Sequence, residues 1–221
     1  MCNLYSMTTS QQAIREIAGA MNDRAGNLPP FPAIFPDHAA PIVRDRPPGR
    51  ELTMARWGMP SPAFALKGRN CDPGVTNVRN LKSPHWRRWL GVEHRCVAPF
   101  TSFAENEQLP DGSRPPVWFA LDETRPLAFF AGIWTRWTSV RKVREGETTN
   151  DVFAFLTTEP NGHIGSIHPK AMPAILTTRE EIDLWMTAPI EEALKLQRPL
   201  ADGALTIVGR GGKKDEGGLA A

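Results

Sequence analysis

Six apolar runs, each followed by polar turn residues, dominate the chain from residue 95 onward. They are rich in Val, Phe, Ile and Trp, which favour strands over helices. An earlier run, residues 51–60, has the same character and ends at a Gly/Pro turn. The pattern predicts an α+β fold with a single β-rich domain, but it does not distinguish a barrel from a sandwich. The six runs are residues 95–100, 116–122, 126–137, 151–158, 171–177 and 204–209.

Helix signals are short and lie between or outside these runs, so we expect short peripheral helices. Residues 8–21 have helical apolar spacing, and Thr9 and Gln12 have the spacing of a capping box. Ser83 is the predicted N-cap of a second helix, followed by Pro84 and ended by Gly91. Further helices are predicted after Thr178, with Glu181 completing a capping box, and at residues 190–197.

The remaining segments are predicted to be irregular. Residues 23–50 are rich in Pro and Gly, with one short strand expected around Pro41–Arg44. Residues 144–151 are expected to form an exposed hairpin loop. The domain is predicted to cover residues 1–209, and residues 210–221 are expected to be a mobile, low-complexity tail.

Length and composition exclude several classes of protein. The 221 residues can bury a core without disulfides or a structural metal. Three widely spaced cysteines form no CxxC pair, so we expect neither a disulfide framework nor a metal site. No apolar run approaches the ~18 residues of a membrane helix. We therefore expect a cytoplasmic monomer that needs no cofactor and does not associate with membranes.

Net charge is only +2, but basic residues gather in two places. Residues 79–95 carry five basic side chains and one acid, and residues 136–144 carry four basic side chains and no acid. Both stretches also contain tryptophan. Basic patches with aromatic neighbours are typical of a path for single-stranded nucleic acid, although a solvated face over core tryptophans gives the same pattern.

The cysteine at position two has a chemistry that no internal cysteine has. If Met1 is removed, Cys2 carries an amine and a thiol on one residue, with ordinary pKa values near ~8 and ~8.5. The amine can attack an aldehyde to form a Schiff base, and the thiol can then close a five-membered thiazolidine ring. Taken alone, a cysteine at position two is more often an incidental small residue than a functional one.

Six motifs occur in an order that resembles the SRAP (SOS-response-associated peptidase) family, whose members shield abasic sites in single-stranded DNA. The resemblance runs from Cys2 to about Leu176 and implies one β-rich fold with a basic groove that ends at the N-terminal cysteine. The motifs are "MC" at the start, "RWGMPSP" at 56–62, "TNVRN" at 76–80, "RCVAPFTSFAE" at 95–105, "FFAGIWTRW" at 129–137 and "SIHPKAMPAIL" at 166–176.

The resemblance implies four catalytic residues. Cys2 matches the nucleophile, and Asn77 matches the asparagine that orients its backbone or amine. Glu105 matches the glutamate that handles protons around the Schiff base, and His168 matches the histidine that helps to open the sugar ring. A carboxylate and an imidazole can share the proton transfers that imine formation requires.

The resemblance also implies contacts with single-stranded DNA that contains abasic sites, which would bring the protein to the nucleoid. Arg79 is expected to meet phosphate, and Trp57 with Pro60 is expected to form a wedge beside the lesion. Lys170 is expected to replace an arginine of the histidine motif. Three further backbone contacts are predicted from charge alone: Arg87, Arg88 and Arg136.

The chain departs from the family pattern near the nucleophile. Asn3 and Leu4 stand where many members have Gly-Arg, so a phosphate contact beside Cys2 is missing and Arg79 is the first candidate to supply it. Around Glu105 the usual glycine and aromatic residues are also absent.

Two other functions stay open at the level of sequence. One is an N-terminal-cysteine peptidase, including self-removal of Met1. The other is a non-covalent module that binds single-stranded DNA through its arginines and tryptophans. Some lyase activity is also expected, because a Schiff base permits β-elimination.

Overall fold

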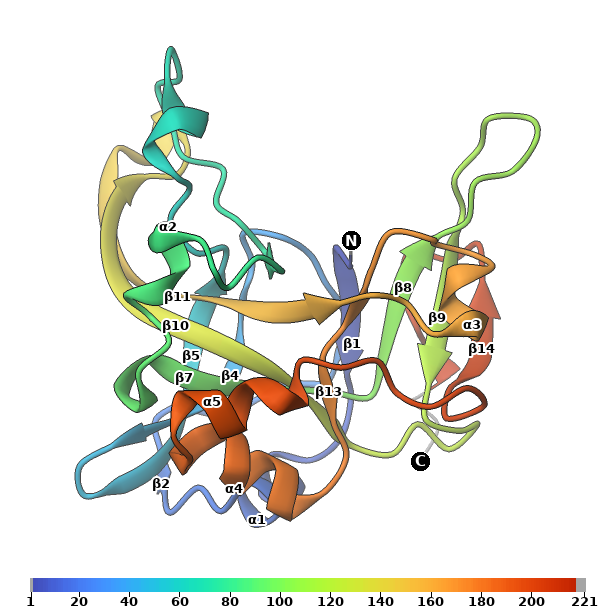
Figure 1. The fold of residues 1–221 in the computed structure, drawn as a ribbon, viewed down its shortest axis with the longest axis horizontal. Coiled ribbons are helices and arrows are strands. Elements are labelled where there is room, and N and C mark those ends of the chain that lie inside the picture. The colour runs from blue at the N-terminus through green and yellow to red at the C-terminus, as the bar shows by residue number, and fades with distance from the viewer. Residues whose placement is uncertain (1, 218–221) are drawn as a thin grey trace.

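Five strands close into a barrel in the computed structural model, which describes residues 2–217 (Figure 1). In ring order they are β5 (Gly49–Trp57), β4 (Ala39–Arg46), β7 (Arg95–Phe100), β10 (Ala128–Val140) and β11 (Glu147–Thr158). Four of the pairings are antiparallel. The fifth is a short parallel pairing of β11 with β5, in which Phe153 lies opposite Trp57. This closure leaves each barrel strand with two neighbours and identifies the core as a barrel.

A second sheet of five antiparallel strands lies beside the barrel (Figure 1). The chain passes into it directly from β7 through Thr101, whose backbone N–H donates to Ser6 O at 2.8 Å. In spatial order its strands are β14 (Thr206–Arg210), β9 (Pro116–Ala120), β8 (Ser102–Asn106), β1 (Leu4–Met7) and β3 (Phe31–Ile34). The N-terminal strand β1 is therefore paired on both edges.

Four two-residue strands extend the barrel sheet at its margins. β6 runs parallel to β11, and β13 and β12 run antiparallel to β10 and β11. Of these, β6 bears on the candidate site, because it lies close to the N-terminus. Their bounds are β2 (Asn22–Asp23), β6 (Asn77–Val78), β12 (Met172–Pro173) and β13 (Ile175–Leu176).

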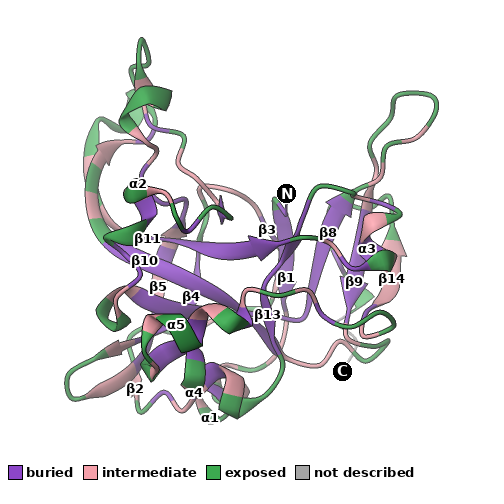
Figure 2. Ribbon diagram, viewed as in Figure 1, coloured by how far each residue is buried: buried purple, intermediate pink, exposed green. Residues whose placement is uncertain are grey.

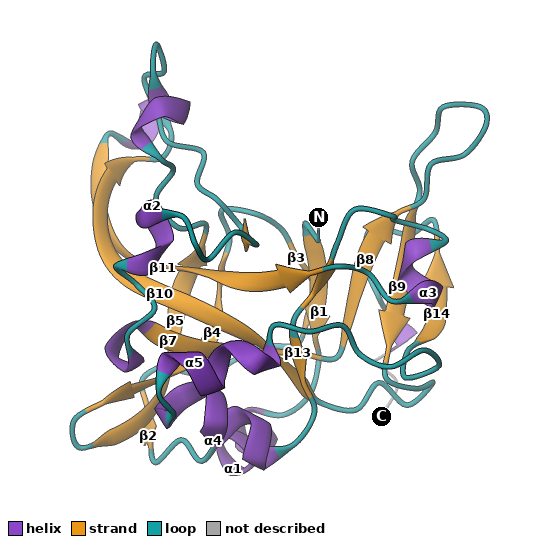
Figure 3. Cartoon of the chain, in the orientation of Figure 1, coloured by secondary structure: helices purple, strands orange, loops and turns teal. Residues whose placement is uncertain are grey.

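All helices are short and lie at the periphery, as the sequence predicts (Figure 3). The α-helices are α1 (Gln11–Ala18), α2 (Pro84–Arg87), α3 (Gly162–Gly165), α4 (Arg179–Thr187) and α5 (Ile190–Ala193). The 3-10 turns are η1 (Ala63–Leu66), η2 (Val92–His94), η3 (Val143–Glu145) and η4 (Leu194–Leu196).

Helix capping follows the prediction in one case and shifts by one residue in another. The Thr178 side chain accepts a hydrogen bond from Glu181 N at 3.2 Å, as the capping box of α4 predicts. At α1 the predicted cap at Thr9 is wrong, because the Ser10 side chain accepts from Ala13 N. Thr9 and Ser10 are adjacent residues that can both cap a helix, and in the structure Ser10 does so.

The core is aromatic and joins the barrel to the second sheet (Figure 2). Phe100 and Phe130 stack with ring centroids 3.9 Å apart, and Phe130 lies 4.4 Å from Phe155. Tyr5 of β1 meets Phe155 and Trp57 edge-on. The first strand of the chain is thus anchored by the rings of the barrel.

Two segments that were predicted to be irregular contain regular structure. Within residues 23–50, β3 is new, and β4 is longer than the predicted Pro41–Arg44. Residues 144–151 are mostly strand, since β11 begins at Glu147. Thr138 and Thr149 pair across this hairpin, with their hydroxyl oxygens 2.7 Å apart. Polar residues form strands here because the hairpin end reaches past the core and is solvated.

The C-terminal segment packs against the second sheet instead of forming the expected mobile tail. The Asp215 carboxylate is 5% exposed and accepts hydrogen bonds from Ser102 Oγ at 2.5 Å and Arg125 Nε at 2.7 Å. Trp118 Nε1 donates to Gly212 O at 2.8 Å. Domain contacts therefore continue past residue 209, whereas residues 218–221 of the predicted tail lie outside the described part of the chain.

We expect Asp215→Asn to lower the free energy of unfolding by about 1–3 kcal/mol, because it leaves Arg125 without its buried carboxylate. Urea unfolding at pH 7 measures the change. Glu123→Gln is the control. Glu123 is exposed and lies two residues before Arg125, so this change should shift stability by less than about 0.5 kcal/mol. Equal stability of the two variants would contradict the anchoring role of Asp215.

Candidate active site

The pairing of β1 with β8 places the N-terminal cysteine beside Glu105. Leu4 lies opposite Ala104 in this antiparallel register, so the residues before Leu4 run alongside the end of β8. Cys2 is fully buried, and its thiol donates to Leu4 O at 3.4 Å. The strand register alone therefore brings residue 2 and residue 105 together.

Asn77 holds the backbone of the cysteine. Its place is set by β6, in which Asn77 pairs with Phe155 of the barrel. The amide Nδ2 donates to Cys2 O and to Thr76 Oγ1, each at 2.8 Å. These bonds leave the peptide unit after Cys2 little freedom to rotate, which fixes the direction of its N-terminal side.

Glu105 and His168 form a second pair at the same place. His168 Nε2 lies 3.7 Å from Glu105 Oε2. The imidazole reaches the site because α3 ends just before it, and His168 N donates to Ile164 O at 2.7 Å. A carboxyl and an imidazole at this separation can both serve one reacting group.

Burial shifts the pKa values of this pair in opposite directions. The Glu105 side chain is 2% exposed, and burial raises the pKa of its carboxyl to about 7. Burial, together with the charge of Lys170, lowers the pKa of His168. Near neutral pH the carboxyl is thus divided between its acid and its base form, while the imidazole is neutral. Both groups are suited to exchanging protons.

The thiol of Cys2 is held in its protonated form. Burial, followed by the charge of Glu105, raises its pKa far above that of a free cysteine. The ordinary thiol pKa near ~8.5 that the sequence suggests is therefore corrected upward. In this fold the Cys2 thiol is therefore a poor nucleophile on its own.

A cavity of about 710 Å³ opens beside the pair. Glu105, His168 and the two residues after Cys2 line its wall, and basic side chains lie at its rim. The residues around it are Asn3, Leu4, Phe35, Pro36, Ala104, Glu105, Asn106, Gln108, Arg114, Pro116, Ile167, His168, Pro169, Lys170 and Lys213. The site is thus open to a ligand at Glu105 and His168.

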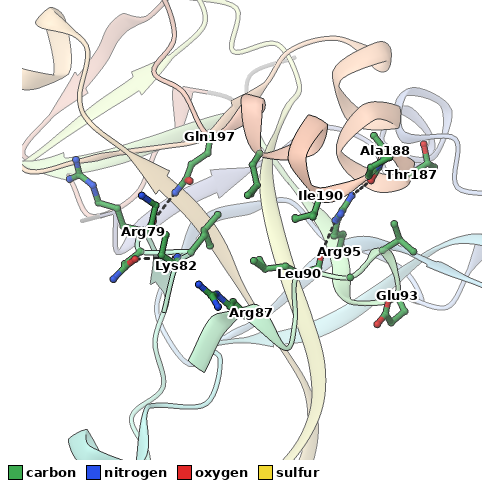
Figure 4. Close-up of a pocket in the computed structure, with 16 residues that line it drawn as sticks. Arg79, Lys82, Arg87, Leu90, Glu93, Arg95, Thr187, Ala188, Ile190 and Gln197 are labelled. Atoms are coloured by element: carbon green, nitrogen blue, oxygen red, sulfur yellow. Dashed lines mark hydrogen bonds between the residues drawn. The ribbon is translucent and has the colours of Figure 1, made fainter. Parts of the chain in front are cut away.

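Arg79 connects this cavity to a second one. Its guanidinium donates to Lys170 O, so it supports the loop that carries His168. Figure 4 shows the second cavity, of about 1040 Å³, with Arg79, Lys82 and Arg87 gathered at one end. The exposed cations therefore continue from the first cavity across Lys170 to the second.

Two other predicted DNA contacts lie farther along the barrel. Arg88 is exposed, and its guanidinium carbon lies 3.9 Å from the centre of the Trp89 ring. Arg136 is also exposed and lies 3.5 Å from Asp151. Trp89 itself is buried, whereas Trp137, next to Arg136, is partly exposed.

The predicted wedge at Trp57 and Pro60 is wrong for this structure. Trp57 is 0% exposed, stacks on Phe155 with ring centroids 4.9 Å apart, and donates from Nε1 to Thr76 O. Pro60 is also buried, and its carbonyl lies 2.9 Å from His85 Nε2. Trp57 ends β5 on the inward side, where the barrel closes against β11, so it belongs to the core.

Phe64 is the exposed aromatic side chain that the sequence interpretation missed. It lies in η1, on the loop between β5 and β6 that projects from the barrel in turquoise (Figure 1), and it is 76% exposed. Lys67 and Arg69 follow it on the same loop and are also exposed. The signal was present, since an apolar ring stands among small, polar and basic residues in "SPAFALKGR".

No group of three or more His, Cys, Asp or Glu side chains within residues 2–217 is arranged to hold a metal ion. No helix in the same range has the length and apolar character needed to cross a bilayer.

Cys2, a buried carboxyl and an imidazole thus lie together on a β-rich fold, and this arrangement defines a candidate N-terminal nucleophile site. The chain belongs to the SOS response associated peptidase (SRAP) family, whose profile matches residues 1–208. Membership supports a function associated with DNA damage. A search of curated proteins gives no match.

Two crystal structures share the fold. A protein from Bacteroides thetaiotaomicron is 20% identical, with a TM-score of 0.69 over 93% of this chain and 90% of that one. A phage-related protein from Bordetella bronchiseptica is 19% identical, with a TM-score of 0.67 over 93% of this chain and 92% of that one. At this identity the likeness concerns the fold.

The raised pKa of Glu105 should make the free energy of unfolding depend on pH. In the unfolded chain its pKa lies near the ordinary value of 4.5, whereas in the fold it is about 7. The folded protein thus holds this proton more tightly, so the stabilising contribution is fully present below pH 4.5 and is lost as the pH rises through about 7.

We expect the unfolding free energy of the wild type to fall relative to Glu105→Gln by about 3 kcal/mol over this range, at about 1.4 kcal/mol per pKa unit. Urea unfolding of both proteins between pH 4 and pH 8 checks the difference. Parallel curves would show that the carboxyl has no raised pKa.

Proposed function

We propose that the protein traps abasic sites in single-stranded DNA by forming a thiazolidine with Cys2 after Met1 is removed. The observation that carries the proposal is the Glu105–His168 pair, which lies beside a cysteine whose carbonyl is held by Asn77. Glu105 and His168 line a cavity that also carries basic side chains, which suits a phosphodiester strand.

The reaction begins at nitrogen. The free amine of Cys2 attacks the aldehyde carbon of the ring-opened abasic sugar and gives a carbinolamine. Loss of one water gives the imine, and the thiol then adds across the C=N bond, with its sulfur on carbon and its proton on nitrogen. The sum is aminothiol plus aldehyde giving thiazolidine plus water, with no change of oxidation state.

The buried carboxyl and the imidazole supply the proton transfers. With a pKa of about 7, Glu105 can accept a proton from the attacking amine and return one to the departing hydroxyl. The neutral imidazole of His168 can accept the hydroxyl proton of the closed sugar as the ring opens. The protonated thiol suits the last step, because it brings the proton that the imine nitrogen needs.

The DNA strand is proposed to run from the cavity across Lys170 to Arg79 and Arg87, which are exposed along this path. Arg88 and Arg136 extend the basic surface along the barrel. Phe64, with its neighbouring cations, is proposed as the platform on which a base stacks in place of Trp57.

A second candidate is peptidase activity, which the family description favours. Its narrow form is removal of Met1 through Cys2, after which the same residue acts on DNA. Non-covalent binding of single-stranded DNA is the remaining alternative, and both give results different from those of the trap.

We expect the purified protein to form a heat-stable adduct with a single-stranded oligonucleotide that carries one abasic site, seen as a shifted band on a denaturing gel. Cys2→Ala should abolish the band, because the remaining N-terminal amine gives only a hydrolysable imine that no thiol can close into a ring. Cys71→Ala, at a partly exposed cysteine on the β5–β6 loop, is the matched control and should leave it unchanged.

Other outcomes separate the alternatives. Binding of the oligonucleotide without any adduct would favour the non-covalent module. Cleavage of unrelated peptides, lost in Cys2→Ala, would favour the peptidase. Intact mass must show that Met1 is absent from the protein that reacts.

A further inference from the structure

The cavity beside Glu105 carries three basic side chains from three separate parts of the chain. Arg114 comes from the loop between β8 and β9, Lys170 from the loop after α3, and Lys213 from the C-terminal segment. Within residues 2–217, none of the three forms an ion pair with a carboxylate. Their charge is therefore available to a ligand.

The acid on the cavity wall does not cancel this charge. Glu105 is the one carboxyl among the lining residues, and burial leaves it only partly ionised near pH 7. The cavity thus has an excess of positive charge, and its walls are of low polarity at Leu4, Phe35 and Ile167. Such a cavity concentrates anions.

Lys213 is held in place from both sides. Gly212 O accepts a hydrogen bond from Trp118 of β9, and Asp215 is bound to Ser102 of β8, the strand that carries Glu105. The backbone at Lys213 is therefore fixed relative to the catalytic carboxyl. An exposed lysine on a mobile tail would pay a larger entropic cost to hold the same position.

Lys213 lines the same cavity as Leu4, which stands where many family members have an arginine. Leu4 lines the same cavity but packs its side chain against Ala104 and Trp118. The SRAP profile ends at residue 208, so Lys213 lies beyond the matched residues. The cation is supplied by a segment outside the family match.

We propose that Lys213 and Arg114 form a subsite for one phosphodiester group of the DNA strand next to the abasic sugar. This inference rests on the proposed function, because it names a contact for the DNA strand that this function requires. Lys213 is a binding residue in this account, and the proton transfers stay with Glu105 and His168.

The test separates binding from chemistry by using a single-stranded oligonucleotide with a central tetrahydrofuran residue, an abasic analogue that has no aldehyde. Fluorescence anisotropy gives the dissociation constant at several salt concentrations. We expect Lys213→Ala to weaken binding about three- to tenfold and to reduce the salt slope by about 0.7, the value for one phosphate contact on a single strand.

Lys214→Ala is the matched control, since it removes the same charge from the next residue, which is exposed and does not line the cavity. It should change binding by less than twofold. Lys213→Arg should retain most of the affinity. Equal effects of Lys213→Ala and Lys214→Ala, or an unchanged salt slope in Lys213→Ala, would overturn the subsite.

A second arm identifies which phosphate is bound. Oligonucleotides in which one phosphate at a time is a neutral methylphosphonate should weaken wild-type binding most at a single position beside the analogue. At that position Lys213→Ala should cause no further loss. A free-phosphate site would instead show Lys213-dependent competition by millimolar inorganic phosphate and no preferred methylphosphonate position, which would also overturn the proposal.

These outcomes differ from failure of the trap. If the wild type forms no adduct with an aldehyde-bearing abasic oligonucleotide, the proposed chemistry fails, whereas the analogue still reports on the subsite. If the adduct forms and Lys213→Ala behaves as Lys214→Ala, the subsite alone fails.

Discussion

The pairing of β1 on both of its edges is the constraint on which the site depends. β8 on one side and β3 on the other fix the register of residues 4–7, and Tyr5 locks the strand into the aromatic core of the barrel. The chain start therefore reaches a set position at the end of β8, beside Glu105. A terminus held in this way would lose little further conformational freedom on reacting, so its reacting groups are already positioned.

Burial then sets the protonation states of the groups at the site. It raises the pKa of the Cys2 thiol and of the Glu105 carboxyl, so sulfur is a poor first nucleophile while the carboxyl exchanges protons near neutral pH. The same burial keeps His168 neutral. A thiolate would react with many electrophiles. In the proposed reaction, the protonated thiol adds to the imine that the freed Cys2 amine has made, which favours aldehydes over other partners.

The sequence predicted which candidate residues lie together better than it predicted the surface. Cys2, Asn77, Glu105 and His168 come from four distant segments, and ordered motifs identified them because each motif includes the strand or loop that places it. The SRAP family and the β-rich fold were confirmed. Trp57 was misplaced because a tryptophan at a strand end can face either way, and only closure of the barrel turns it inward. The C-terminal segment looked mobile from composition, but one buried carboxylate at Asp215 anchors it.

The most direct test of the central claim is the mass of the cross-linked N-terminal peptide after digestion of the adduct formed with abasic DNA. The account predicts a peptide that begins at Cys2, lacks Met1 and carries the DNA fragment with loss of one water. Because a thiazolidine has no C=N bond, treatment with borohydride should leave this mass unchanged. Attachment at a lysine, retention of Met1 on the linked peptide, or a gain of two hydrogens on reduction would contradict the account.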